Sequence, residues 1–365
     1  GIRDASVTGV QTCALPILNM KKFLVFLLIL LVGIAFIPTK NYAADDTLEL
    51  LPTMTTETNS QNRVWVGTFQ LVWNEIVDNV AKNPVQFVDF DSSMAKNLNK
   101  KEFIKNNISS NSYYTKYGIV SPQLKKEIAK AIKKKFRETS DILDMFDFTK
   151  KPNDIFVYAM LKKDFKFLSA FDKLPQGCFG ENRTPVKYFG IKDNSNKKLY
   201  KNVEVLFYNN DNDFAVKLLT KGNDEVLLYR TNDDKTFDKY FQDINQKSKD
   251  YTGSKSFDKG DNLMVPDINF YKMGGFEELE GHKILNTNFY IDKTVETIDF
   301  KMNNEGVKLK SEAAVMVRCM SLAPQSGRYF MFNDTFVLFL IEKGQKVPYF
   351  AIRVHDVDAI NKLKK

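Results

Sequence analysis

The spacing of apolar residues predicts that the first part of the chain is helical. In residues 64–80, apolar side chains recur every three or four positions, which is the period of an α-helix. Pro84 ends this segment, because proline cannot continue a helix. Residues 125–137 repeat the pattern, and Ser121 and Pro122 open this helix as N-cap and first helical residue. Residues 140–148 predict a third, short helix.

Beyond Pro152 the pattern becomes that of strands. Residues 155–161 form a continuous apolar run, which is typical of a strand buried on both faces. The helical first part and the strand-rich remainder together predict an α+β fold with antiparallel sheets, N-terminal helices and a C-terminal β-hairpin. Three pairs of apolar or alternating segments are each joined by turn-forming residues and predict hairpins: 203–208 with 214–219, 295–302 with 307–317, and 336–341 with 349–354.

Residues 1–19 do not have the sequence pattern of a folded domain. Residues 7–17, VTGVQTCALPI, resemble the translation of a sequencing-library adapter. Residues 1–19 are therefore interpreted as an assembly artefact rather than as structure, and Cys13 is excluded with them.

A leader sequence follows. Two lysines after Met20 precede an apolar run over residues 23–37, which is shorter than the roughly 20 residues that a membrane-spanning helix needs. A membrane anchor is thus the weaker interpretation. The pattern predicts a signal peptide over residues 20–43, cleaved near Ala43 or Ala44. We expect a secreted, periplasmic or cell-surface protein, and the lysine- and asparagine-rich usage favours a bacterial source.

Residues 44–62 are rich in threonine and asparagine and predict a flexible lead-in to a single domain over residues 63–365. The chain of 365 residues is 43% hydrophobic and 27% charged, which is an ordinary globular composition. This composition excludes collagen-like, coiled-coil and fully disordered classes.

The sequence offers little for catalysis or metal binding. Its two histidines, His282 and His355, have no nucleophile motif beside them, and no G-x-S-x-G occurs. Cys178 and Cys319 either pair in an oxidising compartment or stay reduced. Two cysteines and two histidines have no metal-ligand spacing. We therefore expect no enzymatic activity, no cofactor and no metal.

The one cluster of basic residues, over residues 125–137, lies on the predicted basic helix, opposite its apolar positions. Such a pattern is typical of a solvated outer face, and a weak polyanion contact is the alternative. No specific nucleic-acid site is expected. The candidate contact residues are Lys125, Lys126, Lys130, Lys133, Lys134 and Arg137.

From residue 155 onward, five segments resemble the serpin family in the same order along the chain. They are 155–161, 203–208 with 213–219, 265–270, Glu305-Gly306 at the place of the serpin hinge, and the C-terminal pair 332–342 with 348–354. The resemblance implies a serpin-like monomer with a large antiparallel-rich central sheet. The N-terminal half departs from the family, since it is shorter and lacks a clear N-x-x-x-S-P-x-S motif.

In serpins, the loop after the hinge is cut by a protease and then inserts as a new strand. Alternate residues of an inserting segment must be buried. This requirement is met here, but Val307 and Leu309 are bulkier than the family's small hinge residues. We therefore expect slow insertion, or a segment already paired with the preceding strand. The hinge assigned by the resemblance consists of Glu305, Gly306, Val307, Leu309, Ser311 and Ala313.

The family's spacing from the hinge glycine places the reactive bond at Met320-Ser321, with Arg318-Cys319 as the alternative. The resemblance therefore implies a secreted serpin-like protein that is non-inhibitory or weakly inhibitory and acts by binding or structure. The alternative is a suicide-type inhibitor of an extracellular serine or cysteine protease. An unrelated secreted α+β binding protein is a third interpretation.

Overall fold

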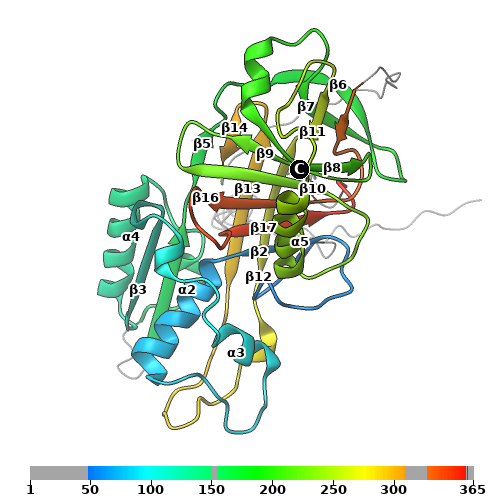
Figure 1. The fold of residues 1–365 in the computed structure, drawn as a ribbon. Helices are drawn as coiled ribbons and strands as arrows, with labels where there is room; N and C mark the ends of the chain where they lie inside the picture. The colour runs from blue at the N-terminus through cyan, green and yellow to red at the C-terminus, as the bar shows by residue number, and fades with distance from the viewer. Residues whose placement is uncertain (1–47, 150–153, 309–326, 359, 361–365) are drawn as a thin grey trace, which may run out of the picture. The chain divides into compact units, whose positions relative to one another are not determined.

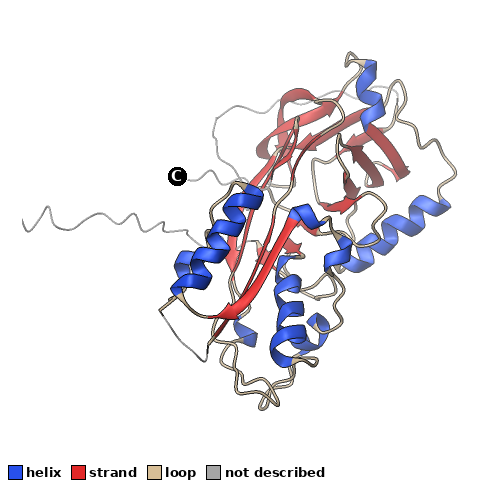
Figure 2. Ribbon diagram, turned by 90° about the vertical axis from the view of Figure 1, so that its left-hand side faces the viewer, coloured by secondary structure: helices blue, strands red, loops and turns tan. Residues whose placement is uncertain are grey.

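A computed structural model gives the structure of residues 48–149, 154–308, 327–358 and 360 (Figure 1). The predicted artefact and signal peptide, residues 1–43, lie outside these ranges. Strands make up the larger share of the regular structure, and helices pack beside them (Figure 2). The expected α+β class is confirmed. None of the described helices has the length and apolar character needed to cross a membrane.

Among the described strands, the largest sheet has seven and holds the predicted C-terminal hairpin, β16–β17, at its centre. Every position of β16 is buried, because the strand is central and both faces are covered. One of the covering elements is helix α5 (Phe237–Asp250). The strands in spatial order are β1 (Glu49–Leu50), β2 (Arg63–Val66), β17 (Phe350–Val354), β16 (Phe336–Glu342), β10 (Asp224–Arg230), β9 (Asp213–Leu219) and β8 (Val203–Asn210).

Three smaller sheets complete the described part of the chain. The first has the order β15 (Tyr329–Met331), β11 (Asn262–Pro266), β7 (Thr184–Ile191) and β6 (Asp172–Phe179). The second has the order β12 (Ile268–Gly274), β13 (Glu296–Asn303), β14 (Gly306–Lys308) and β5 (Asp164–Lys166). The third pairs β3 (Tyr113–Ile119) with β4 (Ile155–Leu161).

The predicted first helix is wrong at its beginning. Residues Arg63–Val66 form β2, which is buried at all four positions and pairs with β17. The helix proper is α2 (Thr68–Glu75), and it continues as a π-helix over Ile76–Ala81. Apolar residues at both strand and helix positions obscure this boundary, because a fully buried strand shows no alternation.

The predicted basic helix is confirmed as α4 (Pro122–Phe136). The Ser121 hydroxyl oxygen accepts a hydrogen bond from the Leu124 amide at 3.1 Å, which caps the helix as expected. Another short helix, α3 (Ser93–Leu98), was not anticipated. The predicted helix over residues 140–148 is wrong, since only the single 3₁₀ turn Leu143–Met145 forms there.

The predicted flexible lead-in over residues 44–62 is wrong for its described part, residues 48–62. Strand β1 pairs with β2 in parallel, and Leu48, Leu51 and Met54 are buried in the core. Threonine and asparagine content suggested a loop, but three apolar anchors and two backbone pairs fix the segment to the sheet.

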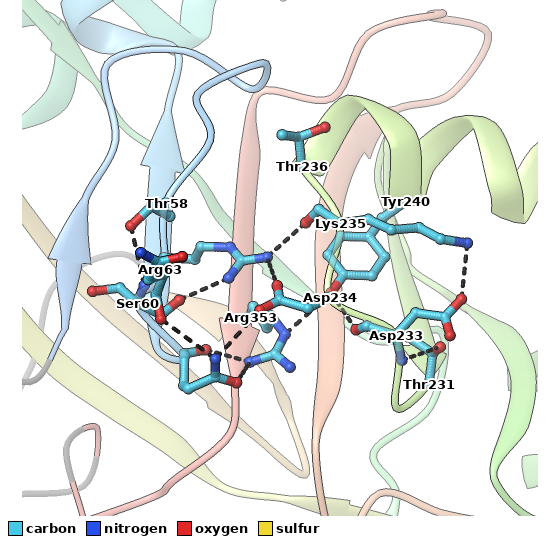
Figure 3. A network of polar contacts seen from close by, with 12 residues as sticks. Thr58, Ser60, Arg63, Thr231, Asp233, Asp234, Lys235, Thr236, Tyr240 and Arg353 are labelled. Atoms are coloured by element: carbon cyan, nitrogen blue, oxygen red, sulfur yellow. Dashed lines mark hydrogen bonds and ion pairs between the residues drawn. The ribbon is translucent and has the colours of Figure 1, made fainter.

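Two buried arginines reinforce this attachment (Figure 3). Arg63 donates hydrogen bonds to the Asp234 carboxylate at 2.6 Å and to the Lys235 carbonyl at 2.6 Å. Arg353 donates to the Tyr240 hydroxyl at 3.1 Å and to the Gln61 carbonyl at 2.6 Å. Burial alone would raise the pKa of Asp234, but the Arg63 hydrogen bond and the two guanidinium charges lower it below its ordinary value.

Candidate functional site

The segment assigned as the hinge forms a short strand between two others. β14 pairs antiparallel with β13 on one side and with β5 on the other (Figure 1). The tight turn before it is closed by the Glu305 amide, which donates to the Asn303 side-chain oxygen at 2.9 Å. β14 therefore continues β13 as a hairpin, which is the second of the two outcomes expected from the sequence.

Gly306 is required by the close approach of β5. A Cβ atom at this position would lie 2.1 Å from the Phe165 carbonyl oxygen and 2.7 Å from the Lys166 Cα. Both neighbours are backbone atoms of a paired strand, so neither can move away without breaking the ladder. Glycine is thus the residue that lets the strand enter this position.

The two residues after Gly306 face opposite ways. Val307 is fully buried opposite Met302 and Phe165. Lys308 is exposed, and its Nζ lies 3.9 Å from the Asp164 carboxylate. The alternation is that of a strand with one apolar face. Of the remaining predicted site residues, Leu309, Ser311, Ala313, Arg318, Cys319, Met320 and Ser321 lie outside the described residues and stay predictions.

The hinge strand belongs to the second sheet, which has four strands, and not to the seven-stranded one. Beyond β14 that sheet has a gap. Residues 296–300 of β13 pair with β12 on one side, and no described strand pairs with their other side. Among the described strands, β4 likewise pairs with β3 alone. The expectation that β4 is a strand is confirmed, but only one of its edges has a described partner.

A cavity of about 650 Å³ lies between these two strand edges. Residues of β4 and β13 line its sides, and one face of α2 contributes Phe69, Val72, Trp73 and Ile76. Loops over residues 138–148 and 288–295 complete the walls. The cavity is therefore bounded by apolar side chains together with the backbone of two strands.

Glu296 is the polar group buried most deeply in this lining. It lies at an inward position of β13 and is 3% exposed. One carboxylate oxygen accepts a hydrogen bond from the Phe69 amide at the beginning of α2, at 3.1 Å. The other, Oε2, is buried without a hydrogen-bond partner among the described residues. Burial raises the pKa of Glu296 to about 8, against a small lowering by the Phe69 amide.

Sequence reasoning missed Glu296, although a signal was present. Along β13 the inward positions are Glu296, Ile298, Phe300 and Met302, all buried. One acidic residue thus occupies the apolar face of an alternating strand. An inward charge in such a pattern is the kind of exception that marks a site.

The remaining cavity lining is acidic rather than basic. Lys162 is paired with Glu138 at 2.7 Å, and the Nζ of Lys293 lies 5.6 Å from the centre of the Phe146 ring. These two lysines are the basic side chains of the lining. The acidic ones are Glu138, Asp141, Asp147, Asp154, Asp292, Glu296 and Asp299.

The basic face of α4 is a separate surface. Leu124, Ile128 and Ile132 are buried on the inner side, so the lysines lie on the outer side as predicted. Lys125 is 2.8 Å from the Asp144 carboxylate. Polyanion contact at this face stays a prediction.

Both histidines have structural neighbours. His355 Nδ1 lies 2.7 Å from the Thr335 hydroxyl, and the His282 ring stacks on Phe90 with centroids 4.6 Å apart. No group of three or more metal-ligating residue types is found within the described ranges. The choice between a Cys178–Cys319 pair and two reduced cysteines, open in the sequence, involves a residue outside those ranges.

No protein-family model matches the chain, and no curated protein matches it. Among solved structures the chain is similar to Serpin48 of the insect Tenebrio molitor, described as a highly specific serpin. The TM-score is 0.46 and the identity 12%, over 83% of this chain and 94% of that one. The chain is also similar to human thyroxine-binding globulin in complex with thyroxine. There the TM-score is 0.42 and the identity 11%, over 82% of this chain and 93% of that one. At this identity the likeness concerns the fold alone.

Proposed function

We propose that the chain is a serpin-like protein that inhibits proteases weakly or not at all and acts by binding. The observation that carries this proposal is the paired state of Gly306–Lys308 between β13 and β5 in the uncut chain. A trap of the kind implied by the serpin resemblance is driven by strand pairing that forms after cleavage. Pairs that already exist before cleavage contribute nothing to that driving force.

The pairing of β14 with β13 and β5 also restrains the beginning of the segment that a protease would have to bind. The Val307 side chain is buried, and its strand is bonded on both sides. Burial of a valine contributes roughly 1.5–3 kcal/mol, so withdrawing this residue from the sheet is costly.

Incubation with trypsin, elastase and papain tests the proposal. We expect cleavage within residues 309–326 without a covalent protease complex on denaturing gels, and with little rise in the melting temperature. Mass spectrometry of the fragments locates the bond, and the variants Met320→Ala and Arg318→Ala distinguish the two predicted sites. A complex that survives hot detergent would show that the protein is an inhibitor and would refute the proposal.

A suicide-type inhibitor is the second candidate, because unpaired edges of β4 and β13 flank the space directly beyond β14. If the register of β14 continued, Leu309 would lie opposite Phe300 and Lys310 opposite Asp299. That arrangement would bury the apolar residue and place opposite charges together. A large rise in melting temperature after cleavage, together with a covalent complex, would favour this candidate.

The proposal includes export and a monomeric state. We propose that the mature chain begins near Ala43 or Ala44 and meets its partner, an extracellular protease or a ligand, outside the cytoplasm. N-terminal sequencing of protein recovered from the culture medium tests the cleavage site. Protein retained with an intact leader would contradict it.

A further inference from the structure

We propose that the cavity between α2, β4 and β13 is a binding site for a hydrophobic amine, whose ammonium group pairs with the Glu296 carboxylate. This inference deepens the proposed binding role, on which it rests, by stating the chemical class of the ligand. It depends on the size of the cavity, its walls, one buried carboxyl group and the balance of charge around it.

The size and walls of the cavity suit a small organic molecule. Its volume of about 650 Å³ falls within the roughly 300–1,000 Å³ typical of small-molecule sites. Such sites are apolar and carry few polar groups, which fix the orientation of the ligand. Aromatic side chains are frequent in the lining, and the face of such a ring attracts a cation. They are Phe69, Trp73, Phe146, Phe148, Phe156, Tyr158, Phe289 and Tyr290.

Glu296 supplies the polar anchor. Its Oε1 is held by the Phe69 amide, so the carboxyl group is fixed in orientation. Its Oε2 is buried without a partner among the described residues, and a buried polar atom left unpaired is destabilising. An ammonium group in the cavity would donate the missing hydrogen bond. Its charge would also favour the ionised form of Glu296, because a buried carboxylate is stable only beside an opposite charge.

The charge of the lining selects a cation over an anion. Among the described residues of the lining, seven are acidic and two are lysines, and one of the lysines is paired with Glu138. A fatty acid or another anionic ligand would therefore enter a region of like charge. An alcohol would satisfy Oε2 but would gain nothing from the surrounding carboxylates. An amine is the class of ligand that both donates a hydrogen bond to Oε2 and carries a charge opposite to that of the lining.

Three ligands of nearly equal size and different charge test the proposal: 4-phenylbutylamine, 4-phenylbutan-1-ol and 4-phenylbutyrate. Binding to the full chain is measured by calorimetry and by tryptophan fluorescence in the variant Trp65→Phe, in which Trp73 of the cavity lining is the remaining tryptophan. We expect the amine to bind at least about tenfold more tightly than the alcohol, and the carboxylate not to bind. Equal affinity for all three, or binding of none, would overturn the proposal.

Variants of the chain test whether the amine binds in the cavity and pairs with Glu296. Glu296→Gln keeps the acceptor for the Phe69 amide, so we expect a folded protein that binds the amine no more tightly than the alcohol. Glu277→Gln, on an exposed residue outside the lining, is the matched control and should leave both affinities unchanged. Val72→Trp fills the cavity and should abolish binding of both ligands. Undiminished amine binding in Glu296→Gln would overturn the proposal.

The outcome of the ligand-binding experiments can be distinguished from the outcome of the protease experiment. A protein that forms no protease complex and binds none of the three ligands would retain the proposed non-inhibitory role and lose this ligand. A protein that forms a covalent complex would lose that role, whatever the amine does. A further outcome is that a synthetic peptide of residues 309–317 binds where none of the three small ligands does. In that case the cavity accepts an added β-strand, and the proposed amine site is refuted.

Discussion

In the seven-stranded sheet, buried charge is paired from several directions. The Lys163 ammonium packs against this sheet, 2.7 Å from the Asp224 carboxylate, and also pairs with Glu342. Burial alone would raise the pKa of Glu342, but hydrogen bonds from Lys163 and Ser109 lower it below its ordinary value. In the cavity beside β4 and β13, by contrast, Glu296 has one unpartnered oxygen and a raised pKa.

The two regions also differ in how they use strand edges. β16 is paired on both sides, and its seven residues are all buried. β4 and the first part of β13 each have one edge without a described partner, and the space between them is a cavity. One region is filled and fully paired, while the other combines a cavity with a buried carboxylate oxygen that has no partner among the described residues.

The sharpest test of the stable region is Phe339→Ala in β16. The Phe339 ring is fully buried and meets the rings of Phe237 and Phe241 on α5, with centroids 6.1 and 5.5 Å away. Removing it leaves a cavity in a region that is already filled. We expect the free energy of unfolding to fall by about 3–5 kcal/mol, measured by urea denaturation. A loss below about 1 kcal/mol would contradict the assignment of stability to this sheet.

Glu296→Gln tests the unsatisfied region through its pH dependence. The unfolded chain releases the Glu296 proton near the ordinary glutamate pKa of 4.5, whereas the folded chain, with a pKa of about 8, holds it to higher pH. The folded state therefore binds more protons between these values, and its stability falls as the pH rises from 5 to 8. The expected loss due to this group is on the order of 3 kcal/mol, and the variant should abolish it.

Melting curves across this pH range provide the measurement, with Glu277→Gln as the control that should behave like the unsubstituted chain. If Glu296→Gln shows the same slope as the control, Glu296 is not the group that titrates.

Gly306→Ala tests whether β14 is paired with both β13 and β5. The added methyl group would meet the Phe165 carbonyl at 2.1 Å, so β14 must move away from β5. We expect a loss of about 1–3 kcal/mol, and faster hydrogen exchange at the Val307 and Lys308 amides. Gly222→Ala is the matched control, because a Cβ atom there meets nothing within 4 Å. Unchanged exchange in Gly306→Ala would contradict the paired state of β14.

Val72→Ala should have the smallest effect. Val72 is half-buried on α2 and lines the cavity, so its removal enlarges a space that already exists. Without a new cavity, the loss of free energy of unfolding should be about 1 kcal/mol, measured by urea denaturation beside Phe339→Ala. A loss as large as that of Phe339→Ala would show that the cavity is filled and would remove the contrast between the regions.

The parts of the fold that were predicted correctly are those in which local pattern and tertiary environment agree. α4 has an N-cap, a proline in its first turn and one apolar face, and it forms at the expected residues. The C-terminal hairpin and the pair β8–β9 follow turn-rich segments between apolar runs, and both form. β2 was mistaken for helix, because its burial comes from pairing with β17, a strand distant in sequence.

The candidate site was predictable only in part. The turn before Gly306 and the inward direction of Val307 follow from glycine and strand alternation, which are local properties. The cavity could not be predicted, because its walls come from α2, β4 and β13, which are far apart along the chain. The reactive-bond and remaining hinge assignments are still predictions.

The sequence by itself determined which segments are strands near the C-terminus, where α4 begins, and that Val307 and Lys308 face opposite ways. Apolar periodicity and turn residues are local patterns that extend over a few positions, so they are visible in a single sequence. Only the tertiary structure decided that β14 enters between β13 and β5 and that Glu296 lies beside empty space. Those features depend on which distant strands pair and which edges remain unpaired, and no local pattern encodes that choice.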